Sequence, residues 1–385
     1  MIIAYLLACI PMAVGAVLWV KDRQIVYWEW LAGAAVGFVV AGIFHVVAIR
    51  GMTRDIEIWS GRLVKATHHP YWHASWTEEE EYTDSDGKTH TRTVHKEEDH
   101  PEYWSCTASY GRGHESEYEI SAQDFANYCK LFGVKEPRAV PGFRPDFDYG
   151  DRNDYLGENH TDYTIPTNTI MQFENRVKAA PSVFSYATVP DSVKVYDWPE
   201  SRDWRRSSRL LGTASSDFST YEWDCLNAQL GPSKKVNMIA VGFDTSDSSI
   251  AQWQEAKWIG GKKNDLVICY GPKQEDGMPA WVYCFGWTDS ELVKKNLESL
   301  FLENAPNNEL LPKIKSEVAA NYVIKDWSQF DYLSIEPPDW AYMVLILVMV
   351  LTQAGFWLWA HYNEADEDNV YGKSRFDRFK FRRFR

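Results

Sequence analysis

The chain has 385 residues and a formal net charge of −14. This length allows two ordinary domains in addition to membrane segments. Its mean hydropathy is mildly polar, which excludes a protein that is apolar along its whole length. The apolar residues are instead concentrated at the two ends, and the middle is rich in acidic, hydroxyl and aromatic residues.

Two uncharged runs near the start of the chain predict a transmembrane helical hairpin over residues 1–50, with spans at 1–20 and 31–49. About 20 apolar helical residues are enough to cross a hydrocarbon core. A cleaved signal peptide is the alternative for the first run. However, a signal peptide needs a basic start, and no Lys or Arg precedes this apolar stretch.

Residues 51–135 have the pattern of a β-rich module. Apolar and polar residues alternate over residues 55–65, as in a half-buried strand. The segment 83–88, with Asp-Gly at its tip, predicts a hairpin turn. Gly111 and Gly113 predict the turn of a second hairpin.

Seven of the ten histidines fall between residues 68 and 114, and Glu and Asp surround them. Pairing of the first hairpin's arms would bring His73 near His90 or His95. Imidazole and carboxylate ligands together suit zinc or another transition metal, so these three histidines are a candidate metal site. The alternative is a charged, solvated hairpin, because the spacing matches no defined metal motif.

Five cysteines lie between the second and third apolar segments. If the compartment is oxidising, two disulfides are predicted, Cys106 with Cys129 and Cys269 with Cys284. Because the number is odd, at least one thiol stays unpaired within a chain. Buried free thiols are the alternative.

Residues 136–200 are predicted to be a loop-rich connector, because they begin with a stretch rich in Pro, Gly, Asp and Asn and then pass into a short helix-like stretch that ends at Pro181. Residues 201–325 alternate between helical and apolar strand patterns, which predicts an α/β domain around a small sheet. The expected strands cover 236–243, 264–271 and 280–287. The expected helices cover 218–231, 247–258, 288–305 and 308–323.

Residues 340–360 predict a third span, with Trp and Tyr at both ends as is typical of membrane interfaces. The chain is therefore expected to be an α+β membrane protein. Its last fifteen residues hold seven Lys or Arg and one acid. Because positive flanks stay cytoplasmic, the tail is expected inside and the soluble region in the periplasm. Four basic residues after the second span favour the opposite orientation, namely Arg50, Arg54, Arg62 and Lys65.

In the tail, residues 361–385, basic residues alternate with phenylalanines. Charges and rings can then lie together on an anionic leaflet, where each basic residue is worth about 1 kcal/mol. A disordered tail that only sets topology is the alternative, and no nucleic-acid partner is expected. The predicted membrane-surface residues are Arg375, Arg378, Lys380, Arg382, Arg383 and Arg385.

Several motifs follow one another between residues 30 and 200. After the apolar hairpin come D-x-E-I-W-x-G from Asp55, DGK-T-x-T-x-T-V from Asp86, GDRNDY from Gly150 and N-R-V-x-A-A-P-S from Asn175. This order resembles a family of uncharacterised membrane proteins of tailed bacteriophages. In that family the β-hairpin often carries cysteines in the manner of a metal knuckle. In this chain the hairpin around Asp86-Gly87 has mostly His, Glu and Asp instead. The resemblance implies a phage-encoded envelope protein and assigns no activity.

Residues 210–325 contain Trp258-Ile259-Gly260-Gly261 at an expected helix end, a Lys-Asn-rich turn into an apolar strand, and Thr288-Asp289 at a helix start. This order resembles the TPM domain, which is named for thylakoid, phosphatase and membrane contexts. The resemblance implies a domain outside the membrane with a transmembrane helix soon after it. It also implies divalent-metal binding and weak phosphatase activity.

If the TPM resemblance holds, the metal site should be built from carboxylates at strand ends. In an open sheet, ligands gather beyond the carboxyl ends of the strands. Asp244 and Asp247 follow the first expected strand of the domain, and Asp289 follows the third. Together they are a candidate site for Ca²⁺ or Mg²⁺. The alternative is that Asp247 and Asp289 are ordinary helix N-caps.

No nucleophile–base pair, phosphate loop or dinucleotide fingerprint occurs in the sequence, and no catalytic residue is predicted. The expected function is a non-enzymatic, membrane-anchored interaction or structural protein. It would present its α/β domain outside the bacterial inner membrane to a protein partner or to another copy of itself. Its 18 Trp and 21 Tyr favour this role, because such side chains dominate binding surfaces. The alternatives are a metal-dependent phosphatase-like hydrolase and an oligomeric channel.

Overall fold

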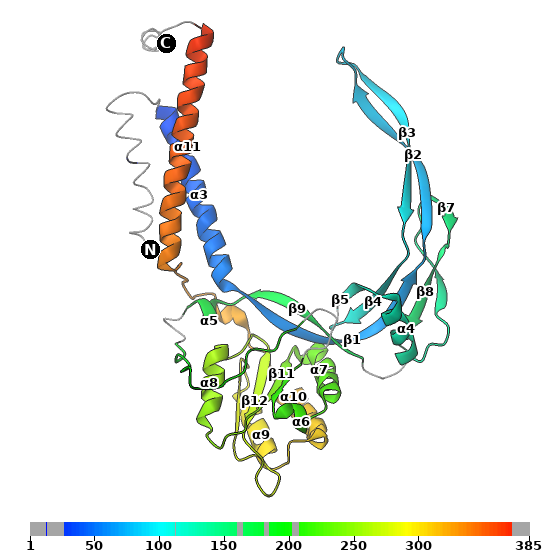
Figure 1. The fold of residues 1–385 in the computed structure, drawn as a ribbon, viewed down its shortest axis with the longest axis vertical. Helices are drawn as coiled ribbons and strands as arrows, with labels where there is room; N and C mark the ends of the chain where they lie inside the picture. Colours follow the sequence, from blue (N-terminus) through cyan, green and yellow to red (C-terminus); the bar gives the residue numbers. More distant parts are fainter. Residues whose placement is uncertain are drawn as a thin grey trace. The chain divides into compact units, whose positions relative to one another are not determined.

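The computed structural model describes Ala13 and residues 27–371, except residue 112 and the segments 160–164, 181–184 and 202–207. Its helices and strands form a mixed α+β fold (Figure 1), which confirms the coarse fold class. The chain forms two compact units. Unit 1 comprises Met1–Arg54, Glu174–Ser185 and Gln329–Arg385, and unit 2 comprises Asp55–Phe173 and Tyr186–Ser328.

Unit 1 contains two long helices, α3 (Tyr27–Thr53) and α11 (Asp339–Tyr371), and the short α5 (Arg176–Ala179). The two long helices lie side by side (Figure 1) and bury a small apolar cluster of Ala41, Leu345 and Met349 between them. Gly37 is buried one turn before Ala41. Small residues at such a seam let two helices approach closely.

Of the described helices, α3 alone is both long and apolar enough to cross a membrane, with a mean hydropathy of 1.9 over Ala35–Thr53. In α11 the apolar part among the described residues, Asp339–Gly355, is shorter. The first expected span, residues 1–20, lies outside the described residues apart from Ala13. The length and composition of the described helices therefore support one of the three predicted spans.

The β-rich part of unit 2 begins with a sheet of order β5-β4-β1-β8-β6, in which β9 also pairs with β1. The bounds are β1 (Arg54–His69), β4 (Tyr103–Ser109), β5 (Glu115–Ile120), β6 (Arg138–Pro141), β8 (Asn153–Glu158) and β9 (Pro166–Glu174). Leu63, Ala66 and Cys106 lie in its core, and α4 (Ala122–Leu131) contributes Phe125 and Tyr128. This sheet confirms both the predicted first strand and the second hairpin.

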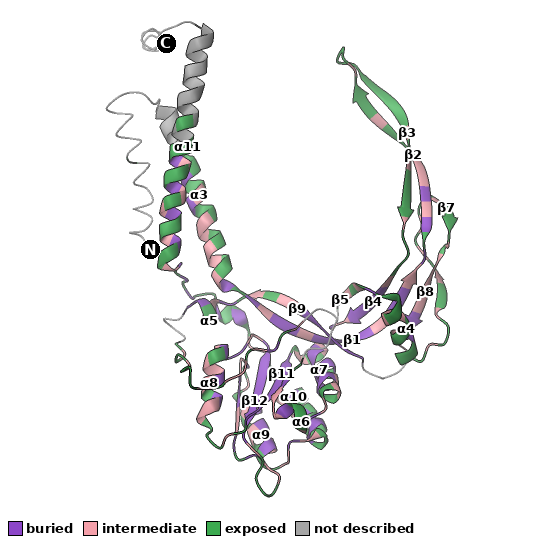
Figure 2. Cartoon of the chain, viewed as in Figure 1, coloured by how far each residue is buried: buried purple, intermediate pink, exposed green. Residues whose placement is uncertain are grey.

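A second sheet has the order β3-β2-β7, with β2 (Trp72–Thr83), β3 (Thr89–His100) and β7 (Phe147–Gly150). β2 and β3 form the first predicted hairpin. At its turn, the amide of Asp84 donates to the carbonyl of Lys88 over 2.9 Å, and Gly87 has a φ of +77°. We call residues 77–96 the outer ribbon, and none of them is buried (Figure 2).

The prediction of a loop-rich connector over residues 136–200 is wrong in its first half, because β6, β7, β8 and β9 lie there. The helix-like pattern around residues 166–174 is in fact strand β9. β6, β7 and β8 are only four to six residues long and contain Pro, Gly or Asp, which disfavour strands locally. Strand pairing stabilises them instead, because β8 pairs with β1, β7 with β2 and β6 with β8. Such tertiary context overrides local propensity.

The α/β part of unit 2 is a sheet of order β10-β11-β12-β13. The strands are β10 (Leu210–Gly212), β11 (Asn237–Gly242), β12 (Asp265–Tyr270) and β13 (Val282–Gly286). The helices are α6 (Ala214–Asp217), α7 (Thr220–Lys234), α8 (Ser249–Trp258), α9 (Glu291–Leu302) and α10 (Leu311–Asn321). Core contacts place α7, α9 and α10 on one face and α8 on the other. The predicted α/β elements are all present.

Buried polar contacts join β1 to the α/β part. The guanidinium of Arg209 donates to the Ser60 hydroxyl of β1 over 2.9 Å and pairs with Asp224 over 3.3 Å. The side-chain amide of Asn264 donates to the Ile58 carbonyl over 2.7 Å. Burial lowers the pKa of Arg209. These contacts explain why the β-rich module and the α/β domain form one compact unit.

Candidate functional site

The three aspartates predicted to hold a divalent cation do not come together. β11 and β12 are parallel, so Asp244 and Asp247 follow the edge at which both strands end. β13 is antiparallel to β12, and its last residue, Gly286, pairs with Leu266 near the start of β12. Asp289 therefore lies at the opposite end of the sheet, and a six-residue strand separates the two ends by roughly 20 Å.

Local contacts account for two of these carboxylates. Asp247 accepts the amide hydrogen of Ser249 at the start of α8 over 2.9 Å, and this bond lowers the pKa of Asp247. Asp289 pairs with the Nζ atom of Lys325 over 3.2 Å. The alternative, that Asp247 and Asp289 are helix N-caps, is not confirmed either, because the N-cap residues of α8 and α9 are Ser248 and Ser290.

The candidate histidines are also apart. In the hairpin register, His73 lies opposite Asp99, His95 opposite Thr77 and His90 opposite Tyr82. These positions are four and five residues apart along β2, which corresponds to roughly 13 and 17 Å. Each imidazole has its own nearby carboxylate. The partners are Asp99 for His73 at 2.7 Å, Asp84 for His90 at 2.8 Å and Glu97 for His95 at 3.9 Å.

Within the part of the chain that the structure describes, no three His, Cys, Asp or Glu side chains are placed to hold one metal ion. The divalent cation thus remains a prediction from sequence alone. The basic tail residues from Arg375 to Arg385 lie outside the described residues.

The predicted disulfide between Cys269 and Cys284 is wrong. These residues belong to neighbouring strands, but Cys284 lies opposite Ile268. Cys284 packs in the core under α7, α9 and α10, and Cys269 in the core under α8. The two side chains point to opposite faces of one sheet, and a disulfide requires Cβ atoms about 4 Å apart that face each other.

The predicted disulfide between Cys106 and Cys129 is also wrong, because both thiols are buried and free in the β-rich module. The Sγ atom of Cys129 lies 2.7 Å from where a Cβ on Gly157 would be. Gly157 of β8 pairs with Ala66 of β1, and Ala66 pairs in turn with Cys106 of β4. Cys129 therefore lies against β8, and β1 separates β8 from the strand that carries Cys106. Burial raises the pKa of Cys106 to about 12, so this thiol stays protonated.

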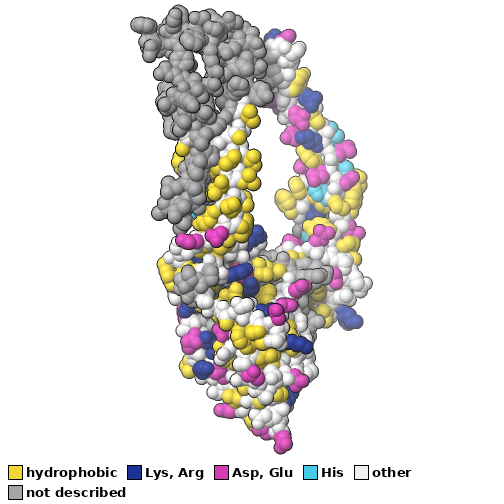
Figure 3. Space-filling view, turned by 60° about the vertical axis from the view of Figure 1, so that its left-hand side comes forward, with side chains coloured by type: hydrophobic (Ala, Val, Ile, Leu, Met, Phe, Trp, Pro, Cys, Tyr) yellow, Lys and Arg dark blue, Asp and Glu magenta, His cyan; other side chains and the backbone are white. Residues whose placement is uncertain are grey.

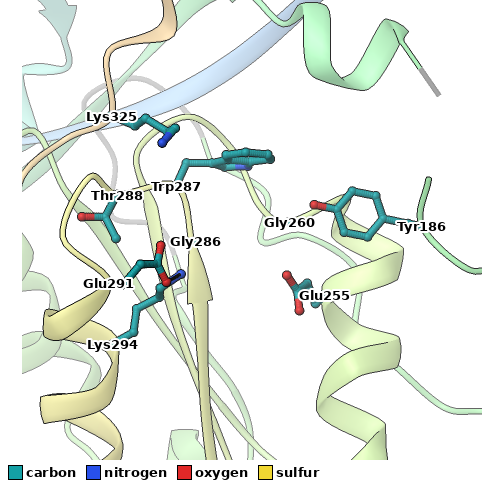
Figure 4. Close-up of a pocket in the computed structure, with 9 residues that line it drawn as sticks. All are labelled: Tyr186, Glu255, Gly260, Gly286, Trp287, Thr288, Glu291, Lys294 and Lys325. Atoms are coloured by element: carbon teal, nitrogen blue, oxygen red, sulfur yellow. Dashed lines mark ion pairs between the residues drawn. The ribbon is translucent and has the colours of Figure 1, made fainter. Parts of the chain in front are cut away.

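A cavity of about 200 Å³ opens at the end of the sheet where β12 begins and β13 ends (Figure 4). Gly286, Trp287 and Thr288 at the end of β13 form its floor. On one side Glu291 and Lys294 come from α9, with Lys325 from the segment after α10. On the other side Glu255 and Gly260 come from α8 and its C-terminal turn, and Tyr186 comes from the segment before β10.

Backbone contacts fix this pocket. The Trp287 indole donates to the Gly261 carbonyl over 3.2 Å, and the Thr288 hydroxyl donates to the Val323 carbonyl over 2.8 Å. Gly260 has a φ of +76°, and a Cβ there would lie 2.5 Å from the Tyr186 hydroxyl oxygen. Only glycine fits both the turn and this close approach.

The charges in the pocket are unevenly compensated. Lys294 pairs with Glu291 over 2.6 Å, and Lys325 pairs with Asp289, just outside the lining. One Glu255 oxygen accepts the Tyr283 hydroxyl hydrogen over 2.5 Å. Among the described residues, no Lys, Arg or His comes within ion-pair distance of Glu255.

Two of the TPM-like motifs contribute to the lining of this pocket, through Gly260 and Thr288. The metal site was nevertheless predicted on Asp244, Asp247 and Asp289, none of which lines it. Sequence reasoning missed Tyr186, Glu255, Lys294 and Lys325, which come from separate segments with no motif of their own. Comparisons with protein-family models, curated proteins and solved structures return no match. Both family resemblances therefore remain expectations.

Proposed function

We propose that the chain is a membrane-anchored interaction protein, in which α3 and α11 lie in a bilayer and carry unit 2 at its surface. The supporting observation is the apolar surface of this helix pair (Figure 3). On α3, Phe38, Ile43 and Val47 are 62%, 60% and 62% exposed, and on α11, Met343 and Leu347 are 70% and 58% exposed.

Water would make such a surface costly, because each large apolar side chain forgoes about 1.5–3 kcal/mol of burial free energy. Soluble monomers rarely expose continuous apolar patches of this kind, whereas lipid removes the cost. Arg50, in the last turn of α3, is the single charged residue of the candidate span. At that position its long side chain can reach the interface.

The pocket favours binding over catalysis. The hydroxyl of Thr288 is engaged with a backbone carbonyl, and none of the described residues that line the cavity is a cysteine or a histidine. Burial and the Glu255 charge raise the pKa of Tyr186 to about 12, so its hydroxyl stays neutral near pH 7. A hydrolase without a metal would require an activated nucleophile, whereas a binding role requires none.

Fractionation of cells that express the full chain tests the anchoring. We expect the protein to stay in the membrane pellet through an alkaline carbonate wash and to be released by detergent. Replacing Phe38 and Ile43 by Asp should move a large part of it to the wash, because a charge at mid-span costs about 2.5–3.5 kcal/mol. The matched control, Thr91→Asp with Thr93→Asp in the outer ribbon, should stay in the pellet. Recovery of the unaltered chain without detergent would overturn the proposal.

We further propose that unit 2 lies outside the inner membrane, as the charge of the tail suggests. Protease added to intact spheroplasts should then cut unit 2, and a label on the C-terminus should be protected. Protection of unit 2 until the cells are lysed would reverse the orientation without affecting the anchoring.

A further inference from the structure

We propose that the pocket at the C-terminal end of β13 binds a cationic group, an ammonium or a guanidinium, with Glu255 as its counter-ion. The proposal concerns the α/β part alone and does not depend on the membrane anchoring. It follows from the charge balance, the free polar atoms and the aromatic walls of the cavity.

The charge balance leaves one negative charge without a partner. The amines of Lys294 and Lys325 are neutralised by Glu291 and Asp289. Two acids line the cavity, Glu255 and Glu291. Of these, Glu255 has no Lys, Arg or His within ion-pair distance among the described residues. An anionic ligand would have to displace one of the two acids and also approach Glu255. A cation meets neither obstacle.

Two polar atoms beside this charge remain available. One oxygen of Glu255 is occupied by the Tyr283 hydroxyl, and the structure gives the other oxygen no hydrogen-bond donor. The Tyr186 hydroxyl, next to Gly260, likewise has no bonded partner among the described residues. An ammonium or guanidinium could donate to both oxygens at once. Hydrogen bonds in which a charged donor meets a carboxylate are about twice as strong as neutral ones.

Aromatic rings supply the rest of the site. The rings of Tyr186 and Trp287 border the cavity (Figure 4), and aromatic faces attract cations. Trp287 is held by its bond to the Gly261 carbonyl and by an edge contact with Trp327, with 5.6 Å between ring centroids. The volume, about 200 Å³, is below the roughly 300 Å³ at which drug-sized ligand sites begin. It suits a group the size of one side chain.

Calorimetric titration of the purified full-length protein in detergent tests the proposal. The probes are butylamine, lysine and arginine blocked at both backbone ends, and blocked norleucine as the neutral match for lysine. We expect the cationic probes to bind and blocked norleucine not to bind. Tighter binding of the blocked amino acids than of butylamine would identify a polypeptide side chain as the ligand, and the reverse would identify a free amine.

The variant Glu255→Gln keeps the shape of the side chain and removes its charge. It should weaken binding of the cationic probes by about tenfold or more, equivalent to about 1.4 kcal/mol. The control Glu275→Gln removes an exposed acid from the loop between β12 and β13 and should change nothing. Unchanged binding in Glu255→Gln would overturn the proposal, as would equal binding of blocked norleucine or no binding of any cation. An unaltered melting curve for Glu255→Gln would confirm that the variant is folded.

Discussion

The two smaller sheets of unit 2 are held together in different ways. In the α/β sheet, every residue of β11 and β12 is buried, with helices on both faces. In the outer ribbon no residue is buried, and six acidic residues face three Lys or Arg. The first sheet is stabilised by removal of apolar surface from water. The outer ribbon is held by cross-strand hydrogen bonds, by ion pairs, which water and salt weaken, and by contacts of the exposed Tyr82 ring with His90 and Arg92.

The exposed edges of the two sheets differ as well. On β13, the backbone amide of Cys284 points away from β12 and is capped by the Glu298 carboxylate over 3.0 Å. On β3, no other described strand pairs with the free edge. Natural sheets cover or charge such edges to prevent uncontrolled pairing. The α/β sheet does so with one carboxylate, whereas the ribbon relies on its many charges.

The largest expected effect comes from an ion pair that lies in the buried region. Arg209 and Asp224 have side chains only 2% and 1% exposed. Arg209→Met should lower the free energy of unfolding by about 3–5 kcal/mol, because it leaves Asp224 without its buried counter-charge. Denaturant unfolding of the full chain in detergent, followed by tryptophan fluorescence, measures this. Adding Asp224→Leu should restore part of the loss, and a single-variant loss below about 1 kcal/mol would contradict the expectation.

Apolar truncations give the next contrast. Leu266 on β12 is fully buried, so Leu266→Ala should cost about 2–5 kcal/mol. Val94 on β3 is half-buried in the ribbon, and Val94→Ala should cost less than about 1 kcal/mol. Both variants are compared by the same unfolding experiment. Similar losses for the two would mean that the ribbon packs against something and would break the comparison.

A titration sharpens the same contrast. Glu57 on β1 is 4% exposed, and burial raises its pKa more than Lys263 lowers it. The folded state therefore holds this proton more tightly than the unfolded state, and stability is lost as the pH rises from the unfolded pKa of about 4.3 through the folded pKa. In Glu57→Gln this loss is absent.

The measurement is the unfolding free energy of both proteins at pH 5 and pH 8. The free energy of unfolding of the variant should increase relative to that of the unaltered chain as the pH rises. The Gln side chain can still accept the hydrogen bond of the Trp59 indole, whose Nε1 atom lies 2.9 Å from the Oε1 atom of Glu57. A difference that is constant over this range would show that Glu57 titrates normally.

The same division explains which parts of the fold the sequence predicted. β11 and β12 appeared as continuous apolar runs, because both their faces are buried. β8 and β6 did not, because they are defined by the pairing of β8 with β1 and of β6 with β8. The direction of β13 could have been predicted from the sequence. The connection between Tyr270 and Val282 contains no helix, and a parallel return needs a crossover of a dozen or more residues. An antiparallel β13 would have separated Asp289 from Asp244 at once.

The pocket was less accessible to sequence reasoning. Its unbalanced charge, Glu255, lies within α8, whose sequence contains no functional motif around this residue. The charge becomes informative only when Tyr186 and Trp287 are known to lie beside it and when Lys294 and Lys325 are known to be paired elsewhere. These facts depend on contacts between segments far apart in the chain. The motifs quoted from the sequence include Gly260 and Thr288, which line the pocket, but not the residues that give the site its chemistry.

The smallest expected effect belongs to an ion pair in the ribbon. Lys96 bonds Glu78 over 2.6 Å and lies 3.3 Å from Glu80, and the first of these distances is shorter than that between Arg209 and Asp224. Removing the pair by Lys96→Met should nevertheless leave the unfolding midpoint unchanged within error, because water already solvates both partners. The same experiment at low and high salt should agree. A loss approaching that of Arg209→Met would contradict this expectation, because it would mean that geometry, rather than burial, determines what an ion pair contributes to this protein.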